Sequence, residues 1–302
     1  MDRNFLGPAL LAASQIVRLV RRRDFDLFIA SLTPLDIPLA LKEAGVRNLV
    51  IDVGDEMRDL DLKIAHLSHA AYLRIWLPGI LANRYERILY LDADIFCAGG
   101  DISRLLDIQI GSHAVAAVLD KAQWLTPDEP VLEFERYGIP VHRYLNSGAL
   151  LLDVARYNEQ KIFDLFVARQ RKGVESQFHD QGILNLVLRG NFAQLSPVWN
   201  WQWTHRYPVF TKLARPFLLH LSGLPKPWQA HEQKTRFPRA IIDAYQRSLD
   251  QPDEPLAFET DHSGGVREPF VDQINNLGGH LHVWSRYRRQ MRQFPDPYRA
   301  LY

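Results

Sequence analysis

The sequence predicts an α/β protein in which a mostly parallel central sheet is flanked by helices and followed by a small helical extension. Short apolar runs alternate with segments of helical periodicity over most of the chain, as in proteins built on parallel sheets. Two carboxylates directly follow one apolar run, where parallel strands present ligand-binding residues. The composition is globular, since 47% of the 302 residues are hydrophobic and 24% are charged.

Length, charge and cysteine content exclude several classes of protein. At roughly 150 residues per domain, the length allows one large domain or two small ones. A formal net charge of +1 argues against nucleic-acid binding through overall positive charge. The single cysteine, Cys97, excludes an intrachain disulfide and a cysteine-based zinc site, and we expect it to be buried. No apolar run reaches the ~18 residues that span a bilayer, so we expect a cytoplasmic protein.

The N-terminal elements follow from apolar spacing and from helix-breaking residues. Apolar residues recur at helical spacing over residues 5–20, which predicts an amphipathic surface helix. The apolar run 27–32 predicts a buried strand. Thr33 then caps a helix expected over 34–45, and the run 49–53 predicts the next strand.

The same alternation continues through the middle of the chain. Strands are expected over 87–91, 114–119 and 150–154, and helices over 68–81, 162–172 and 181–188. Prolines that bracket acidic residues near 251–254 then break the pattern. We therefore expect a main domain over residues 1–250 and a helical, basic and aromatic extension over 251–302.

A pair of carboxylates is the first candidate site. Asp-x-Asp occurs at 24/26, 59/61 and 92/94, but only Asp92 and Asp94 directly follow a strong apolar run. In extended backbone, residues two apart face the same side. A divalent cation would relieve the repulsion between the two carboxylates and could hold a diphosphate. Solvated acids at a strand end, or a helix cap, explain the pair equally well when it is taken alone.

Three further motifs carry polar residues with a chemical use. His220 follows an apolar run and offers an imidazole nitrogen to a metal, while Gly223 and Lys226 suit a phosphate. Asp180 precedes a helix and could simply be its N-cap. The run 144–148, Tyr-Leu-Asn-Ser-Gly, could simply be a turn.

Together and in this order, these motifs resemble the retaining glycosyltransferases of family 8, the group of glycogenins and bacterial lipopolysaccharide glucosyl- and galactosyltransferases. The resemblance covers residues 2–228, roughly three quarters of the chain, and the stretch 220–228 is its most specific part. It implies a Rossmann-like nucleotide-diphospho-sugar transferase fold of the GT-A type.

The resemblance also implies roles for individual residues. Asp92, Asp94 and His220 would hold Mn²⁺, with Mg²⁺ as an alternative. The donor contacts would come from Asp2 and Asn4 at the nucleotide, from Asp92, Gly223 and Lys226 at the diphosphate, and from Arg74, Asn146, Asp180 and Gln181 at the sugar.

The activity implied is Mn²⁺-dependent transfer of glucose or galactose from a UDP-sugar to a hydroxyl of a glycan or lipopolysaccharide-type acceptor. Of the residues expected near the anomeric carbon, Asp180 and Gln181 would be catalytic. Because an amide is a poor nucleophile, we expect front-face attack by the acceptor, with Gln181 orienting or stabilising the positively charged sugar. A non-catalytic nucleotide-sugar or glycan-binding protein is the alternative, and a metal-dependent nucleotidyltransferase is a third possibility.

Two departures from the family pattern stand out. The family has an interior strand immediately before Asp2, and only Met1 precedes Asp2 here. Residue 182 is glycine where some members carry another acid. The oligomeric state is left open.

Two aromatic segments could serve the acceptor. Trp199, Trp201 and Trp203 alternate, which suits either a sugar platform or, as we favour, core packing. Residues 281–302 carry five arginines among aromatic residues. They could dock on an anionic membrane surface or form a solvated tail.

Overall fold

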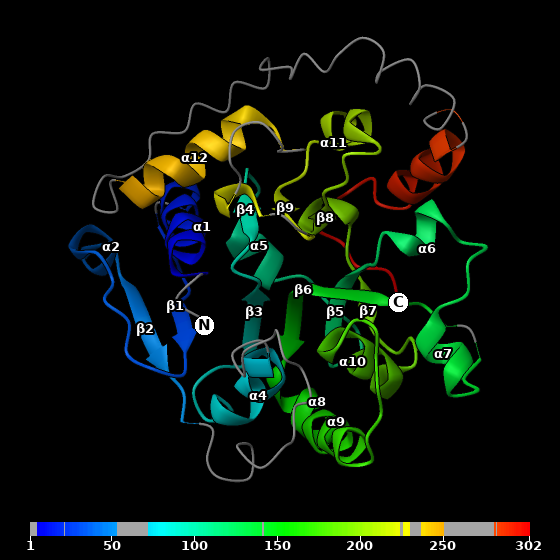
Figure 1. Cartoon of the computed structure of the whole chain (residues 1–302). Coiled ribbons are helices and arrows are strands. Elements are labelled where there is room, and N and C mark those ends of the chain that lie inside the picture. The colour runs from blue at the N-terminus through cyan, green and yellow to red at the C-terminus, as the bar shows by residue number, and fades with distance from the viewer. Residues whose placement is uncertain are drawn as a thin grey trace.

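A computed structural model shows an α/β protein (Figure 1). It describes residues 5–20, 22–52, 72–140, 142–223, 226–229, 237–250, 281 and 283–302. Asp2, Asn4, the 59/61 carboxylates and Ser68, where the helix to Leu81 was expected to begin, lie outside the described residues.

The N-terminal region forms its own small layer. Its elements are α1 (Leu6–Leu19), β1 (Leu27–Ser31), α2 (Leu39–Glu43) and β2 (Val46–Val50). The strands β1 and β2 pair in parallel, and no described strand joins them to the central sheet.

The helix predicted over 34–45 is shorter than expected. Pro38 disfavours helical backbone at the residue before it, so α2 begins after Pro38 and Thr33 caps no helix. Gly45, at φ +83°, ends α2. The strand expected over 49–53 therefore starts earlier, at the first residue of β2.

The central sheet has the order β3-β6-β5-β7. Its strands are β3 (Arg87–Leu91), β5 (Val115–Leu119), β6 (Leu145–Asp153) and β7 (Ala193–Gln194). Among the described strands of this sheet, β3, β5 and β7 run in one direction, in agreement with the predicted mostly parallel sheet, whereas β6 runs antiparallel to β3 and β5. Leu119 pairs with Leu145, so the excursion through α6 (Ala122–Leu125) and α7 (Leu132–Arg136) returns the chain to the end of the sheet that it left.

Helices cover both faces of this sheet (Figure 1). Val115 and Ala117 of β5 face one core, which includes residues of α4 (Leu73–Ile80), α8 (Val154–Glu159), α9 (Ile162–Arg171) and α10 (Asp180–Leu188). Ala116 and Val118 face a second core with α1 and α5 (Ile102–Leu106). Tyr72 and Trp76 are buried in the first core and pack there.

A third sheet, of order β4-β9-β8, lies beside the central one. Its strands are β4 (Ile95–Cys97), β8 (Trp201–Gln202) and β9 (Leu218–His220), with η3 (Pro197–Trp199), α11 (Pro208–Ala214), η4 (Pro227–Gln229) and α12 (Arg239–Asp250) around them. Trp199, Trp201 and Trp203 are at most 8% exposed and divide between two cores. Core packing is therefore confirmed, and these indoles form no sugar platform.

The chain ends packed on the rest of the molecule and is not a loose solvated tail. A helix over 283–292, red in Figure 1, lies beside α11, and the ring of Tyr287 stacks on Phe210 with centroids 4.7 Å apart. Leu301 forms a β-bridge to Gln194. Residues 251–280 lie outside the described part, so a domain boundary after residue 250 stays a prediction. Among the described helices, none has the length and hydropathy to cross a membrane.

Candidate active site

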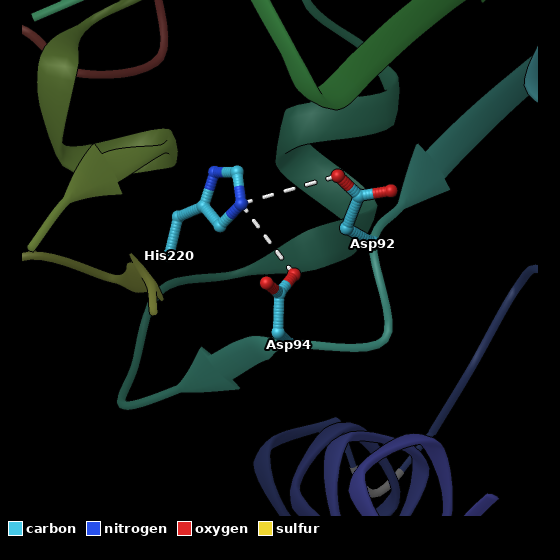
Figure 2. A group of neighbouring side chains, drawn as sticks. All are labelled: Asp92, Asp94 and His220. Atoms are coloured by element: carbon cyan, nitrogen blue, oxygen red, sulfur yellow. Dashed lines mark ion pairs between the residues drawn. The ribbon is translucent and has the colours of Figure 1, made fainter. Parts of the chain in front are cut away.

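Two carboxylates and one imidazole converge where β3 and β9 end (Figure 2). Nε2 of His220 lies 3.9 Å from Oδ2 of Asp92 and 3.4 Å from Oδ1 of Asp94. One ligand atom from each residue lies within 4.8 Å of the others. Such oxygen and nitrogen ligands suit a divalent metal ion. The carboxylates do not share one strand face as predicted, because they occupy the turn between β3 and β4.

His220 is held with one nitrogen facing the carboxylates. Its Nδ1 lies 3.2 Å from Oδ1 of Asn146 and 3.1 Å from Oδ1 of Asn200. Both neighbours are acceptors, so this geometry assigns the Nδ1 proton as donor and leaves Nε2 as the ligand atom. Hydrogen bonds of this kind fix the imidazole ring for metal binding.

The Asn-Ser-Gly motif lies on β6 and is not a turn. A Cβ at Gly148 would lie 2.4 Å from Cε1 of His220, so only glycine lets the imidazole pack against the strand. The Gly148 N–H also donates to Oδ1 of Asn146 at 3.1 Å. Asn146 is therefore bonded to both the strand and the histidine.

Lys226 reaches the same carboxylate pair. Its Nζ lies 2.5 Å from Oδ2 of Asp94 and donates to the Leu221 carbonyl at 3.1 Å. Burial works to raise the pKa of Asp94, but His220 and Lys226 outweigh it and hold that pKa well below its usual range. Gly223 has φ +103° and open space around its Cα, so backbone can approach a ligand there.

Arg74 on α4 links the carboxylate pair to α10. Its guanidinium is buried, with Nη2 2.9 Å from Oδ1 of Asp92 and Nε 3.0 Å from Oδ2 of Asp180. The second contact is an ion pair without hydrogen-bond geometry. Nη1 also donates to the Ser147 carbonyl at 2.9 Å. Burial opposes the charge of Arg74, but Asp180 and Asp92 outweigh burial and raise its pKa.

Asp180 and Gln181 open α10 and are both buried. Asp180 is the first helical residue, and His179 takes the N-cap position, so the N-cap interpretation of Asp180 is wrong. Burial raises the pKa of Asp180, against the lowering effect of Arg74. Gln181 accepts from the Ser147 N–H at 3.1 Å through Oε1.

Asp120 belongs to the same network, although the sequence motifs did not single it out. Its Oδ2 accepts from Nδ2 of Asn146 at 3.0 Å and from Nε2 of Gln181 at 3.2 Å. Its position directly after β5 could have identified it from the sequence, because ligand-binding residues gather at such strand ends. Asn200, which contacts His220, lies between Trp199 and Trp201, and its role was missed because only the tryptophans of this segment were considered.

Comparison with known proteins agrees with this arrangement. Residues 1–232 match the sequence profile of Glycosyl transferase family 8. General stress protein A of Bacillus subtilis is 28% identical over 203 residues, covering 62% of this chain and 68% of that protein. The lipopolysaccharide 1,2-glucosyltransferase of Escherichia coli K12 is 30% identical over 176 residues, covering 53% of this chain. The chain spans 49% of that enzyme's length.

The fold has a solved counterpart. The galactosyltransferase LgtC, in complex with donor and acceptor sugar analogues, matches with a TM-score of 0.64 at 20% identity. The match covers 87% of this chain and 97% of that one, which confirms the predicted GT-A fold. The sequence profile and the shared fold show that the chain belongs to glycosyltransferase family 8.

Proposed function

We propose that this glycosyltransferase moves glucose or galactose from a UDP-sugar to a hydroxyl of a glycan or lipopolysaccharide-type acceptor, with retention of configuration. One observation carries the proposal. A continuous network, buried except at the partly exposed Asp92, runs from the Asp92, Asp94 and His220 cluster through Arg74 to Asp180. The matched lipopolysaccharide 1,2-glucosyltransferase supports the choice of sugar and acceptor, as does the lipopolysaccharide 1,3-galactosyltransferase of Salmonella typhimurium, which is 26% identical over 173 residues.

The residues of the cluster fit a divalent ion, and we assign it to Mn²⁺, with Mg²⁺ as the alternative. Two carboxylates and an imidazole whose Nε2 is free to bind form a suitable donor set. When bound, the ion would stabilise negative charge on the departing diphosphate.

The chain's own groups would hold the two ends of the donor. Lys226, beside Asp94, would carry a positive charge to the diphosphate. Asp92 and Gly223 would complete the diphosphate contacts. Asp2 and Asn4 are proposed to contact the nucleotide, as the family resemblance implies.

On the sugar side, Arg74, Asn146, Asp180 and Gln181 would line the hexose. The Asp180 carboxylate is engaged by the Arg74 guanidinium, which makes it a poor nucleophile. The Gln181 amide is oriented by Ser147 and Asp120. We therefore propose front-face attack by the acceptor hydroxyl, with Gln181 stabilising positive charge on the sugar.

The test is UDP release from a panel of UDP-sugars with and without Mn²⁺. Asp94→Ala should abolish release, whereas Asp36→Ala, at a carboxylate that is 98% exposed, should leave it unchanged. Mn²⁺-dependent release from one UDP-hexose supports the proposal and names the donor. UDP binding without turnover, with a lipopolysaccharide-type acceptor supplied, would instead favour the non-catalytic alternative, and pyrophosphate release would favour a nucleotidyltransferase.

We further propose that the acceptor is met at the cytoplasmic face of a membrane through the surface of the 283–292 helix. Trp284 is 39% exposed there, and Arg288, Arg289 and Arg292 are exposed beside it. Neighbouring α11 exposes Val209 and Leu213. Apolar side chains among arginines suit an anionic lipid surface.

Liposome flotation tests this contact. Vesicles of anionic phosphatidylglycerol should bind the protein and neutral phosphatidylcholine vesicles should not. The double variant Arg288→Glu/Arg289→Glu should lose binding, because it reverses two exposed charges. Deleting 281–302 is unsuitable, since it also removes the buried Tyr287 and Phe294. Equal binding by the double variant and the wild type would contradict the membrane contact.

A further inference from the structure

Glu133 is a buried acid outside the network described above. It lies on α7 and is 3% exposed. Its Oε1 accepts hydrogen bonds from Ser176 Oγ at 2.8 Å, from the Gln177 N–H at 3.1 Å and from the Phe178 N–H at 3.4 Å. Its other oxygen, Oε2, is buried with no hydrogen-bond partner among the described residues. One carboxylate oxygen therefore ties α7 to the loop 176–178.

That loop leads directly into the first turn of α10. His179, which follows it, has φ +52° and ψ −122°. A residue other than glycine rarely adopts positive φ, and it stays there only when surrounding contacts impose it. Asp180 and Gln181 come next. The direction in which these two side chains leave the backbone thus depends on the loop before them.

The loop and the carboxylate pack closely on α10. A Cβ at Gly182 would lie 1.7 Å from Ser176 Oγ and 2.9 Å from Oε1 of Glu133. Only glycine fits in this position, so no side chain separates the Glu133 carboxylate from the helix. A negative charge beside the first turn of a helix is also favourable electrostatically.

We propose that Glu133 is a positioning residue for the transfer reaction. Through the loop 176–178 it holds His179 in its left-handed backbone conformation, so that Asp180 reaches Arg74 and Gln181 reaches Asp120. Glu133 itself contacts neither the Asp180 nor the Gln181 side chain. This inference rests on the proposed function.

The test compares three substitutions on one short helix. Glu133→Ala removes the acceptor, and Glu133→Gln keeps an oxygen for the loop. Glu135→Ala changes an exposed acid two residues away. Hydrogen–deuterium exchange would be read at the amides of Gln177 and Phe178. Steady-state kcat, donor KM and the Kd for UDP would be measured alongside.

Glu133→Ala should speed exchange at both amides at least tenfold. It should lower kcat at least tenfold while the Kd for UDP stays within twofold, because the nucleotide end of the site is separate. Glu133→Gln should recover kcat to within threefold of the wild type, and Glu135→Ala should match the wild type. In a His179→Gly background the loss from Glu133→Ala should shrink, because glycine adopts positive φ without help.

Unchanged amide exchange in Glu133→Ala would overturn the proposal, as would faster exchange with an unchanged kcat. A parallel loss of kcat and of UDP-binding capacity would indicate general unfolding and would also contradict it. If the wild type releases UDP from no sugar, the proposed function fails. The exchange measurement still decides whether Glu133 holds the loop.

Discussion

At the scale of single residues, the metal cluster depends on the space beside His220. Gly148→Ala would place a methyl group 2.4 Å from the imidazole ring, so the ring must turn away from Asp92 and Asp94. We expect Mn²⁺ affinity, measured by titration calorimetry, to fall at least tenfold and stability to fall by about 1–3 kcal/mol. Gly99→Ala is the matched control, because its Cβ would meet only Phe217 at 3.7 Å. Tight Mn²⁺ binding by Gly148→Ala would contradict the assignment.

Arg74 is the only described cation that contacts both Asp92 and Asp180. Arg74→Met would leave the buried Asp180 and the partly buried Asp92 without the counter-charge of Arg74, so it should destabilise the protein by about 3–5 kcal/mol. Urea unfolding measures this loss. Arg156→Met breaks a partly exposed pair with Asp153 and should cost less than about 1 kcal/mol. Similar losses of stability in the two variants would show that the ion pairs of Arg74 stabilise the fold no more than the partly exposed Arg156–Asp153 pair does.

The thiol of Cys97 gives a pH-dependent probe of the core. Burial raises its pKa from 9.0 to about 12. A folded-state pKa above the unfolded value means that the buried thiol stabilises the fold below pH 9, and that this contribution disappears as the pH rises toward 12. At pH 8 the native thiol is protonated, so iodoacetamide should modify it only through unfolding. Rapid modification without urea would contradict its burial.

The sequence predicted which residues form the site better than it predicted how they are arranged. Asp92, Asp94 and His220 stand in recognisable motifs, and they converge. Asp120 carries no motif of its own, and its role arises from side chains that β6 and α10 bring to it. The tight packing at Gly148 depends on the same long-range contacts, which local spacing does not encode.

At the scale of elements, apolar periodicity located most strands and helices, but it did not reveal that β6 runs against its neighbours. The predicted range 87–91 coincides with β3. The beginning of β6 was missed because its first residues, 145–148, include polar ones that read as a turn. They are polar because they face the site. The reversed direction of β6 was also missed, since an apolar run is the same in either direction.

Asn185 joins two of these elements and offers a test at their junction. Its side chain donates to the carbonyls of Leu145 and Gln181 and accepts from the Leu145 N–H at 2.8 Å. Asn185→Leu should leave the backbone N–H and carbonyl of the buried Leu145 without their side-chain partners, at a cost of about 2–4 kcal/mol. Chemical denaturation measures it, with the exposed Asn191→Ala as control. A loss no larger than the control's would mean that the strand is held by packing alone.

At the scale of the whole molecule, the last residues hold the central and third sheets together. The Pro297 carbonyl accepts from Nε1 of Trp199 at 2.7 Å, and the Tyr298 hydroxyl accepts from the Asp101 N–H at 2.9 Å. Leu301 exchanges two backbone hydrogen bonds with Gln194 of β7. The segment 296–302 therefore contributes to the fold itself, whereas Arg288, Arg289 and Arg292 of the 283–292 helix lie on its surface.

Truncation separates these two contributions. Deleting 296–302 should lower the free energy of unfolding by about 3–5 kcal/mol, because five hydrogen bonds at about 1 kcal/mol each are lost and the buried Trp199 N–H loses its acceptor. Urea denaturation measures the change. Arg288→Glu/Arg289→Glu should keep the wild-type midpoint while losing anionic vesicle binding. If the truncated protein unfolds at the wild-type urea concentration, residues 296–302 do not contribute to stability, and the hydrophobic cores alone hold the sheets together.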